Sequence, residues 1–407
     1  MTERLYYLDS YLQTFGARVV SVGDVGGRPS VVLDRTAFYP TSGGQPFDTG
    51  TLGGARVVEV FDREDGAVVH VLEGILELSV AGTGDSALEL VSGRIDWPRR
   101  FEHMQQHTGQ HVLSAAIDRV TGVRTESFHL GTVSSTIDLA RELTLAEIAA
   151  AEELANAVIW EDRPVQIRFV EAEDATALPL RKESARTGPL RIIEVDDFDV
   201  SACGGTHVSR TGAIGIITIS GWERLRGGTR LEFHCGIRAL RAERQLRDTV
   251  AASSRLLSTA ADDLPRGIER VQEDGRDLRR RVKDLEARLA GYEADAIAAR
   301  AVDLHGFRAV AEAVPDADMN AIKTIAQSVA ARPGHAAVLL TASSPASVVI
   351  SRAADVPLDA ARVLKQLIAQ FGGKGGGRPE LAQGGGLAAS TDEILAAARQ
   401  LLNPSDR

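Results

Sequence analysis

The sequence predicts an α+β protein made of four successive parts. Residues 1–95 hold short apolar runs between glycine-rich turns, which predicts a small β-barrel. Residues 96–235 combine helix and strand patterns around two motifs that contain histidine, and residues 236–300 are helical and charged. Residues 301–407 return to a pattern of strands and helices. We therefore expect a β-barrel-like domain, an α+β domain, a coiled-coil helical hairpin and a C-terminal α/β domain.

Size and composition narrow the class of protein. A chain of 407 residues, 44% of them hydrophobic, is longer than one core usually serves. No run of about 18 apolar residues predicts a membrane span, and the start MTERLYYLDSY lacks a signal-peptide pattern. Two cysteines exclude a disulfide framework and fit a reducing compartment, so we expect a cytoplasmic protein. The net charge of −10 argues against a nonspecific DNA-coating protein, although local basic clusters still allow a nucleic-acid partner.

One long polar loop interrupts the expected barrel. The spacing of apolar residues predicts strands at 17–22, 30–33, 55–61 and 67–72. The segment from Leu33 to Gly50, LDRTAFYPTSGGQPFDTG, is rich in glycine and polar residues. It is either a surface turn or a loop that packs on a neighbouring site, since long ordered loops often carry function.

The α+β part contains four candidate metal ligands. It is expected to form helices at 101–120 and 145–161 and strands at 134–139, 165–171, 190–195, 212–219 and 229–234. In the first helix, the motif HTGQH places His107 and His111 four residues apart, on one face. The motif CGGTH then offers Cys203 and His207. Three imidazoles and one thiolate form a nitrogen-and-sulfur set that suits tetrahedral zinc.

Other residues offer alternative ligands. His103 lies one helical turn before His107, and His234 with Cys235 is another soft pair, although adjacent strand residues point to opposite faces. We choose His107 and His111 because the small and polar residues between them leave room for a substrate.

This donor set is more typical of a catalytic metal than of a structural one. Structural zinc sites favour cysteine and CxxC spacing, whereas histidine-rich sites more often keep a position open for water. Zinc in such a site lowers the pKa of bound water toward about 7 and polarises a carbonyl. The chain has neither an HExxH protease motif nor a deaminase motif. Hydrolysis of an ester or amide is the expected reaction class, and a structural metal is the alternative.

Ten positions between residues 264 and 296 follow a heptad repeat. Their steps alternate between four and three residues, which is the a/d seam of a coiled coil. They are Leu264, Ile268, Val271, Gly275, Leu278, Val282, Leu285, Leu289, Tyr292 and Ala296. We expect an antiparallel hairpin with the preceding helix, which serves either as a spacer or as an arm that dimerises the protein.

A glycine-rich segment lies between two helices expected at 358–371 and 391–402. From Gly372 to Gly386 it contains eight glycines together with Lys374 and Arg378. Its open backbone N–H groups and two cations favour an ordered anion-binding loop over a flexible linker. It is not a Walker loop, because GKGGG lacks the Lys-Ser/Thr ending.

Together these motifs resemble the editing domain of alanyl-tRNA synthetases and its freestanding relatives, the AlaX proteins. The family pairs HxxxH with CxxxH, here HTGQH at 107–111 and CGGTH at 203–207. The barrel loop, from DRT at 34–36 through SGGQ at 42–45 to DTG at 48–50, is similar to its N-terminal signature. GGGRP at 375–379, with AQ at 382–383, is similar to the signature of its C-terminal DHHA1 module. The motifs keep the family's order over nearly the whole chain, as in the long form of AlaX.

The resemblance implies zinc-dependent deacylation of tRNA(Ala) mischarged with serine, and also with glycine. No adenylate-forming synthetase core precedes the barrel, so we expect editing in trans and without ATP. Threonyl-tRNA synthetase editing domains share the two ligand motifs but lack the GGGRP module, which makes editing of a tRNA such as tRNA(Thr) the second choice. An RNA-binding protein with a structural zinc site is a further alternative.

Residues beside the ligands are candidates for catalysis and for substrate selection. Relatives often carry a small hydroxyl residue before the second histidine, where this chain has Gln110. Discrimination of serine from alanine is therefore expected to rest on Gln110, Thr108 or Thr206. Asp199 is either a carboxylate that orients a ligand histidine or a turn residue.

Basic residues near the motifs are candidates for contacts with tRNA phosphates, although each alone is more often a solvated charge. They are Arg181, Lys182, Arg186, Arg191, Arg224, Arg226 and Arg230 near the metal motifs, and Lys374 and Arg378 in the glycine-rich segment.

Overall fold

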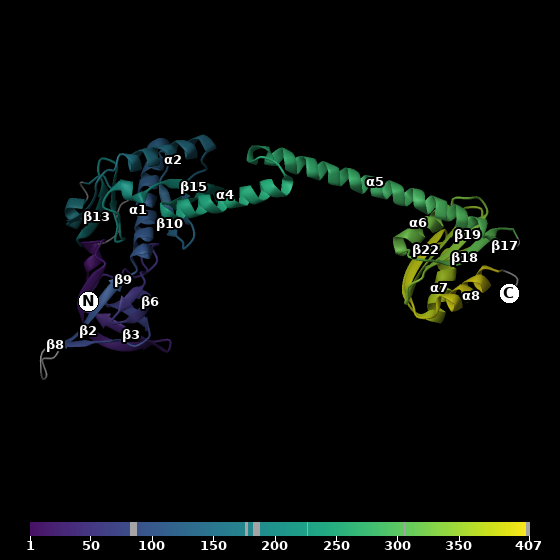
Figure 1. The fold of residues 1–407 in the computed structure, drawn as a ribbon, viewed down its shortest axis with the longest axis horizontal. Coiled ribbons are helices and arrows are strands. Elements are labelled where there is room, and N and C mark those ends of the chain that lie inside the picture. The colour runs from purple at the N-terminus through teal and green to yellow at the C-terminus, as the bar shows by residue number, and fades with distance from the viewer. Residues whose placement is uncertain (82–87, 176–177, 182–187, 226, 305, 404–407) are drawn as a thin grey trace. The chain divides into compact units, whose positions relative to one another are not determined.

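The structure, a computed structural model, forms two compact units, Met1–Ser253 and Ser254–Arg407. It describes residues 1–81, 88–175, 178–181, 188–225, 227–304 and 306–403 (Figure 1). Unit 1 contains both expected N-terminal parts, and unit 2 contains the expected C-terminal part. The finer division into four domains stays a prediction. None of the described helices is both long and apolar enough to cross a membrane.

The first sheet of unit 1 closes on itself as a barrel. Its strands follow the order β2-β3-β7-β6-β5-β9, β9 pairs again with β2, and β8 extends the sheet beyond β9. The strand bounds are β2 Thr14–Val25, β3 Arg28–Leu33, β5 Gly50–Leu52, β6 Ala55–Asp62, β7 Val68–Glu73, β8 Ser79–Ala81 and β9 Leu88–Ile95. Apolar side chains such as Val31, Leu33 and Val57 form its core. The expected N-terminal barrel is confirmed.

A short N-terminal segment lies against this barrel. β1, Glu3–Arg4, pairs in parallel with β4, Arg35–Thr36, and the 3-10 helix η1, Leu5–Tyr7, follows β1.

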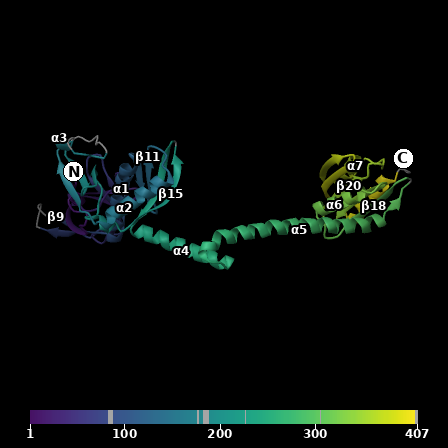
Figure 2. The ribbon, with the colours of Figure 1, turned by 90° about the horizontal axis from the view of Figure 1, so that it is seen from above.

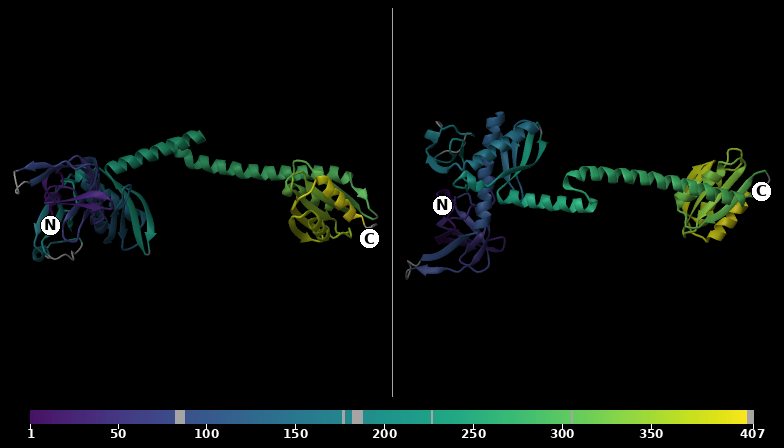
Figure 3. Two further views of the ribbon diagram at one scale, coloured as in Figure 1. Left: turned by 90° about the horizontal axis from the view of Figure 1, so that it is seen from below. Right: turned by 45° about the horizontal axis from the view of Figure 1, so that its top comes forward.

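The remainder of unit 1 is built around α1, Trp97–Thr121, which runs from the end of β9 (Figure 3). Asp96 caps its N-terminus by accepting a hydrogen bond from the Arg99 backbone N–H, and Gly122 ends it in the left-handed conformation. Every side chain from His103 to Ile117 is buried, so α1 has no solvent face along this stretch.

Two sheets and a second helix pack with α1 into one core. One sheet has the order β10-β11-β16-β15 and the other β12-β13-β14. The bounds are β10 Thr125–Leu130, β11 Ser135–Leu139, α2 Leu145–Trp160, β12 Val165–Val170, α3 Ala172–Ala175, β13 Leu190–Val195, β14 Asp199–Ala202, β15 Ile217–Leu225 and β16 Gly228–Cys235. The core includes Leu113 and Ile117 of α1, Ala151 of α2, Ile193 of β13 and Phe233 of β16.

The strand expected at residues 212–219 is wrong over its first half. Thr211–Ile214 forms a 3-10 helix, η3, and β15 begins only at Ile217. Gly215 turns the chain between them with a φ of 88°, a conformation that interrupts an extended strand.

Unit 2 is a six-stranded sheet with helices on both faces (Figure 2). Its strand order is β17-β18-β19-β20-β22-β21. The bounds are β17 Val302–Asp303, β18 Arg308–Val314, α6 Met319–Ala330, β19 His335–Thr341, β20 Ala346–Arg352, α7 Ala360–Phe371, β21 Lys374–Arg378, β22 Leu381–Leu387 and α8 Thr391–Leu402. The helix α5 spans Leu264–Ala299. One core contains α6 and the C-terminal end of α5, and the other contains α7 and α8. This confirms the expected C-terminal α/β fold.

The expected heptad segment is one continuous helix, α5. The helix before it is α4, Ile237–Leu257, and a short 3-10 helix, η4, at Ala261–Asp263 lies between the two. Only the C-terminal end of α5 packs into the unit 2 core, through Ala290, Ala294 and Ile297. The antiparallel hairpin stays a prediction.

The glycine-rich segment is a β-hairpin and not a loop. β21 and β22 pair antiparallel at one edge of the sheet. A Cβ at Gly375 would lie 2.5 Å from the Gln383 carbonyl oxygen, and a Cβ at Gly377 would lie 2.3 Å from that of Leu381. Glycine is therefore needed because the two backbones approach too closely for a side chain.

Candidate metal centre

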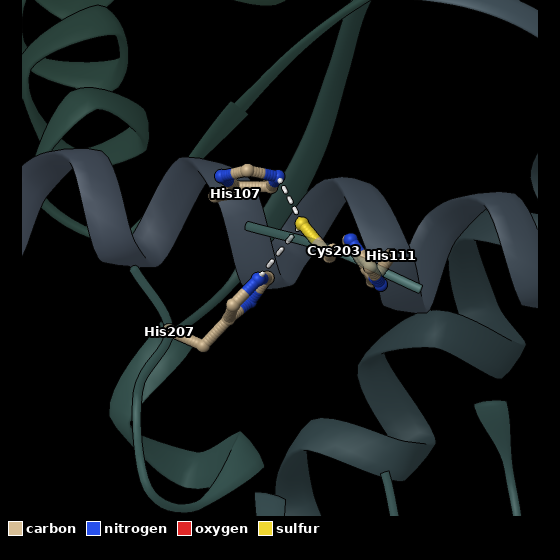
Figure 4. A group of neighbouring side chains, drawn as sticks. All are labelled: His107, His111, Cys203 and His207. Atoms are coloured by element: carbon tan, nitrogen blue, oxygen red, sulfur yellow. Dashed lines mark hydrogen bonds between the residues drawn. The ribbon is translucent and has the colours of Figure 1, made fainter. Parts of the chain in front are cut away.

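The four predicted ligands meet in unit 1, although two separate segments supply them. His107 and His111 come from α1, and Cys203 and His207 come from the loop that follows β14. Their ligand atoms all lie within 4.8 Å of one another. Figure 4 shows the four side chains gathered around Cys203, whose sulfur lies between the rings of His107 and His207.

The spacing of these atoms fits a zinc ion. The Cys203 Sγ is 3.3 Å from the His107 Nε2 and 3.4 Å from the His207 Nε2. Bonds of about 2.0–2.3 Å place the ligands of a tetrahedral zinc ion roughly 3.3–3.7 Å apart. The chemistry of the donor set and its geometry therefore both suit zinc.

The electrostatics of the cluster favour a thiolate. Burial by itself raises the pKa of the Cys203 thiol, but the adjacent His107 and His207 lower that pKa well below its ordinary value. Burial lowers the pKa of His207 to about 3, which keeps this imidazole neutral. A thiolate and a neutral imidazole are the protonation states that bind a metal.

Asp199 contacts His111, the second predicted ligand on α1. Its Oδ2 lies 3.1 Å from the His111 Nδ1, and its Oδ1 accepts a 2.7 Å hydrogen bond from the Arg181 Nε. Burial raises the pKa of Asp199, but His111 and Arg181 outweigh burial and lower it to about 2. For His111, burial lowers the pKa of the ring, but its hydrogen bonds to Asp199 and Cys203 outweigh burial and raise this pKa to about 9. These contacts favour the interpretation of Asp199 as a carboxylate that orients a histidine over its interpretation as a turn residue.

The two threonines beside the ligands are fully buried and hold neighbouring groups. The Thr108 Oγ1 lies 3.2 Å from the His207 Nδ1 and accepts a 3.1 Å hydrogen bond from the Val208 backbone N–H. The Thr206 Oγ1 accepts a 2.9 Å hydrogen bond from the Gln45 side-chain amide. Both hydroxyls thus help to shape the centre, and their expected role in catalysis stays a prediction.

Among the three candidates for catalysis, Gln110 has a side-chain oxygen without a hydrogen-bond partner in the described part of the chain. Its side chain is 2% exposed, and its Nε2 donates a 2.9 Å hydrogen bond to the Ser114 Oγ. Its Oε1 is buried and has no partner within the described part of the chain. A buried acceptor without a donor is costly and needs an explanation.

The long barrel loop packs on α1, as one of the two interpretations of the sequence anticipated. Asp48 of this loop forms a fully buried ion pair with Arg100 of α1. The Arg100 Nη1 also donates a 2.9 Å hydrogen bond to the Ser10 carbonyl. Gln45 of the same loop reaches the His107 ring. Gln45 was not among the predicted site residues. Its place in the family's N-terminal signature is the signal in the sequence that could have identified it.

The alternative ligands lie outside the cluster. His103 is buried on α1, and its Nδ1 has no partner among the described residues. Cys235 lies under α1, where a Cβ on Gly109 would be 2.2 Å from its Sγ. The small residue at position 109 therefore permits close packing of α1 on β16, and the idea that it leaves room for substrate is wrong.

The basic residues near the centre differ in accessibility. Arg191 is 7% exposed, and its Nη1 donates to the Cys203 and Gly205 carbonyls at 2.8 and 2.9 Å. Arg181 is held by Asp199. Arg191 therefore supports the loop that carries Cys203, and Arg181 supports Asp199 of β14. Burial argues against Arg191 as a phosphate contact.

The remaining candidates lie nearer to the surface. Arg230 pairs with Asp138 at 2.7 Å on partly exposed strands, and Arg224 lies 3.2 Å from Glu142. Lys374 and Arg378 are exposed on β21. The candidates outside the described residues are Lys182, Arg186 and Arg226.

Two family models match the chain. The threonyl and alanyl tRNA synthetase second additional domain matches residues 190–232, and the DHHA1 domain matches residues 306–403. The first match includes Cys203 and His207, and the second covers most of the unit 2 sheet. Fold and site thus define a protein that joins a synthetase-type second additional domain to a DHHA1 domain.

Relatives extend this match over nearly the whole chain. The alanyl-tRNA editing protein AlaX-L of Pyrococcus horikoshii is 31% identical over 94% of this chain and 94% of its own length. The chain belongs to this AlaX-L family. The alanine–tRNA ligases of Pyrococcus abyssi and Methanothrix thermoacetophila are 34% and 32% identical over 94% and 98% of this chain. The chain spans 42% and 45% of the length of those two ligases.

Among solved structures, the C-Ala domain of Aquifex aeolicus alanyl-tRNA synthetase is similar to part of the chain. It is 19% identical, covers 25% of this chain and 97% of its own, and aligns with a TM-score of 0.24.

Proposed function

We propose that the protein deacylates tRNA(Ala) mischarged with serine, and also with glycine, by zinc-dependent ester hydrolysis without ATP. The observation that carries this proposal is the cluster of His107, His111, Cys203 and His207, with all three histidines buried, in a member of the AlaX-L family. An aminoacyl ester is already reactive, so modest activation is sufficient. Its substrate is present where proteins are synthesised, which agrees with the cytoplasmic location expected from the sequence.

The chain's own residues prepare the site for this reaction. A bound zinc ion supplies a Lewis acid that polarises a carbonyl or lowers the pKa of a water molecule. Asp199 and Thr108 hold the rings of His111 and His207, and Arg191 holds the loop that carries Cys203. These contacts fix the ligand geometry in advance, and preorganised geometry is the main contribution of a protein to metal catalysis.

Gln110 is our candidate for substrate selection. Its buried Oε1 has no donor among the described residues and can accept a hydrogen bond from the seryl hydroxyl. Alanine has no hydroxyl, so an alanyl ester would leave this acceptor unpaired and bind less well.

The test is deacylation of Ser-tRNA(Ala) and Ala-tRNA(Ala) by zinc-loaded protein. We expect rapid loss of the seryl ester only, and nearly complete loss of activity in Cys203→Ala with the fold retained by circular dichroism. Gln110→Met should lower kcat/KM for Ser-tRNA(Ala) about tenfold, the equivalent of roughly 1.4 kcal/mol for one hydrogen bond.

Two outcomes would contradict the proposal. Absence of turnover on every aminoacyl-tRNA would leave an RNA-binding protein with a structural zinc site. Turnover on mischarged tRNA(Thr) and not on tRNA(Ala) would assign the protein to another tRNA.

For contacts with tRNA we propose Lys374 and Arg378 of β21, together with Arg230 of β16 in unit 1. The glycines around Lys374 and Arg378 leave the backbone of this edge strand open, and both side chains are exposed. Phosphates are recognised by such combinations of cations and free N–H groups.

We also propose that the seam of α5 pairs with a second copy of the chain. Seven of its large apolar side chains, at positions 268, 271, 278, 282, 285, 289 and 292, are 47–66% exposed. A heptad seam of this length is stable in water only when a partner helix covers it.

A further inference from the structure

A tight turn in the barrel loop delivers Gln45 to the metal centre. Ser42 and Gln45 exchange both backbone hydrogen bonds, at 3.2 and 2.9 Å. Gly43 and Gly44 between them have φ values of 53° and 80°, which favour glycine. A Cβ at Gly44 would lie 2.9 Å from the Phe128 ring, so the turn lies directly against β10. Gln45 itself is fully buried.

The side-chain amide of Gln45 makes three hydrogen bonds. Its Oε1 lies 3.1 Å from the Thr206 backbone nitrogen and 2.8 Å from the His107 Nδ1. Its Nε2 donates a 2.9 Å hydrogen bond to the Thr206 Oγ1. A backbone N–H can only donate, so the atom that faces Thr206 N must be the amide oxygen.

This orientation of the amide fixes the tautomer of His107. Because the same oxygen faces His107 Nδ1, that nitrogen must carry the ring proton. The lone pair of the ring then lies on Nε2, which is the atom that faces the Cys203 Sγ at 3.3 Å. Gly205 confines the ring from another side, since a Cβ there would be 2.1 Å from the His107 Cε1.

We propose that Gln45 is a positioning residue of the metal centre. It holds His107 in the Nδ1-protonated form with Nε2 directed at the metal, so that the barrel completes a site whose four ligands all lie outside the barrel. This inference rests on the zinc centre proposed above. It predicts that loss of the Gln45 oxygen weakens zinc binding itself.

The test compares zinc affinity in full-length variants by competition with a chromophoric chelator. Gln45→Met keeps the length of the side chain and removes the acceptor, and we expect it to bind zinc about 10–100-fold more weakly. Gln45→Glu keeps an acceptor for both donors and should bind zinc with nearly the affinity of the wild type. Absorption of the Co²⁺-substituted proteins should show a distorted thiolate site in Gln45→Met and a wild-type spectrum in Gln45→Glu.

Gln106→Met is the matched control. Gln106 is equally buried and is adjacent to His107 in sequence, but its amide bonds only backbone groups such as the Cys235 N–H and carbonyl. We expect this variant to lose a similar amount of stability and to keep its zinc affinity.

Two results would overturn the inference: unchanged zinc affinity in Gln45→Met, or an equal loss of affinity in Gln106→Met. The outcome is separate from that of the proposed function, because zinc affinity is measured without tRNA. A wild-type protein that binds zinc but hydrolyses no ester would contradict the function alone, and one that binds no zinc would contradict both.

Discussion

The three predicted histidine ligands each use one ring nitrogen for a hydrogen bond inside the protein. His107 bonds Gln45, His111 bonds Asp199 and His207 bonds Thr108, at 2.8, 3.1 and 3.2 Å. Each contact occupies one ring nitrogen and leaves the other available to the cluster. Residues outside the predicted ligand set would therefore orient these imidazoles for a metal ion.

A histidine in the barrel, His70, shows how strongly burial lowers the pKa of an imidazole. His70 is fully buried in the barrel, where its Nε2 lies 2.8 Å from the Thr36 Oγ1 and its Nδ1 lies 3.2 Å from the Val31 carbonyl. Burial lowers the pKa of His70 to about 4, and the hydrogen bond to Val31 opposes this only in part.

We predict that His70 makes the barrel less stable in acid. The unfolded chain takes up the proton near pH 6.5 and the folded chain only near pH 4, so stability falls as the pH drops between these values. The slope of the unfolding free energy reaches about 1.4 kcal/mol per pH unit for this one group. The measurement is urea unfolding at several pH values, monitored by the hydrogen exchange of barrel amides. The unfolding free energy should change less steeply with pH in His70→Gln than in the wild type. An unchanged slope in that variant, or an equal change in the exposed-site control His129→Gln, would contradict the prediction.

At the scale of elements, α1 organises the packing of unit 1, because it is buried on all sides from His103 to Ile117. Its ligands occupy one face, and Gly109 between them faces β16 and not the cluster. The same short motif thus supplies two predicted metal ligands and a close helix contact.

We predict that Gly109→Ala destabilises unit 1 by about 1–3 kcal/mol, because the added methyl overlaps the fully buried Cys235 Sγ. Differential scanning calorimetry of the full-length protein measures this as a lower transition temperature. The control is Gly291→Ala in α5, where a Cβ meets nothing within 4 Å. It should stabilise its helix by about 0.5–1 kcal/mol. Equal stability of Gly109→Ala and the wild type would refute the packing role.

The seam of α5 gives a second prediction for an element. Lysine at both Val282 and Leu285 should convert a dimer into a monomer in sedimentation velocity, since each large apolar side chain contributes about 1.5–3 kcal/mol when buried. The control is Arg280→Ala, a position off the seam whose side chain pairs with Asp277. A wild-type protein that sediments as a monomer would show that the seam has another partner.

At the scale of the whole molecule, the two units carry different chemistry. The metal cluster belongs to unit 1, and the exposed β21 with Lys374 and Arg378 belongs to unit 2. If the proposed function is correct, one unit hydrolyses the ester and the other contributes to tRNA affinity.

This division predicts a separation of kinetic effects. The double variant Lys374→Ala/Arg378→Ala should raise KM for Ser-tRNA(Ala) and leave kcat unchanged. The slope of log K for tRNA binding against log salt concentration should become shallower by about 0.7–0.9 for each phosphate that the variant no longer neutralises. Lys365→Ala on α7 is the control for a general loss of charge. A double variant with a wild-type salt slope would exclude β21 from the binding of tRNA.

The sequence by itself determined the features that depend on local spacing. Two histidines four residues apart, a cysteine and a histidine with the same separation, and an unbroken heptad each fix which side chains share a face. The same periodicity predicted the long helices and many of the strands in both units, but not η3 or the β21–β22 hairpin. The fold class and a candidate metal donor set were therefore accessible without a structure.

Only the tertiary structure decided what lies against each of these elements. Gln45 and His107 are 62 residues apart in sequence, and no local pattern reports that contact. Arg191 reads as a surface cation until its guanidinium is found beneath the Cys203 loop. The glycine-rich segment has weak strand propensity, and it forms β21 and β22 because close backbone pairing outweighs that propensity. Spacing along the chain determines which face a residue occupies, whereas its partners depend on how distant segments pack.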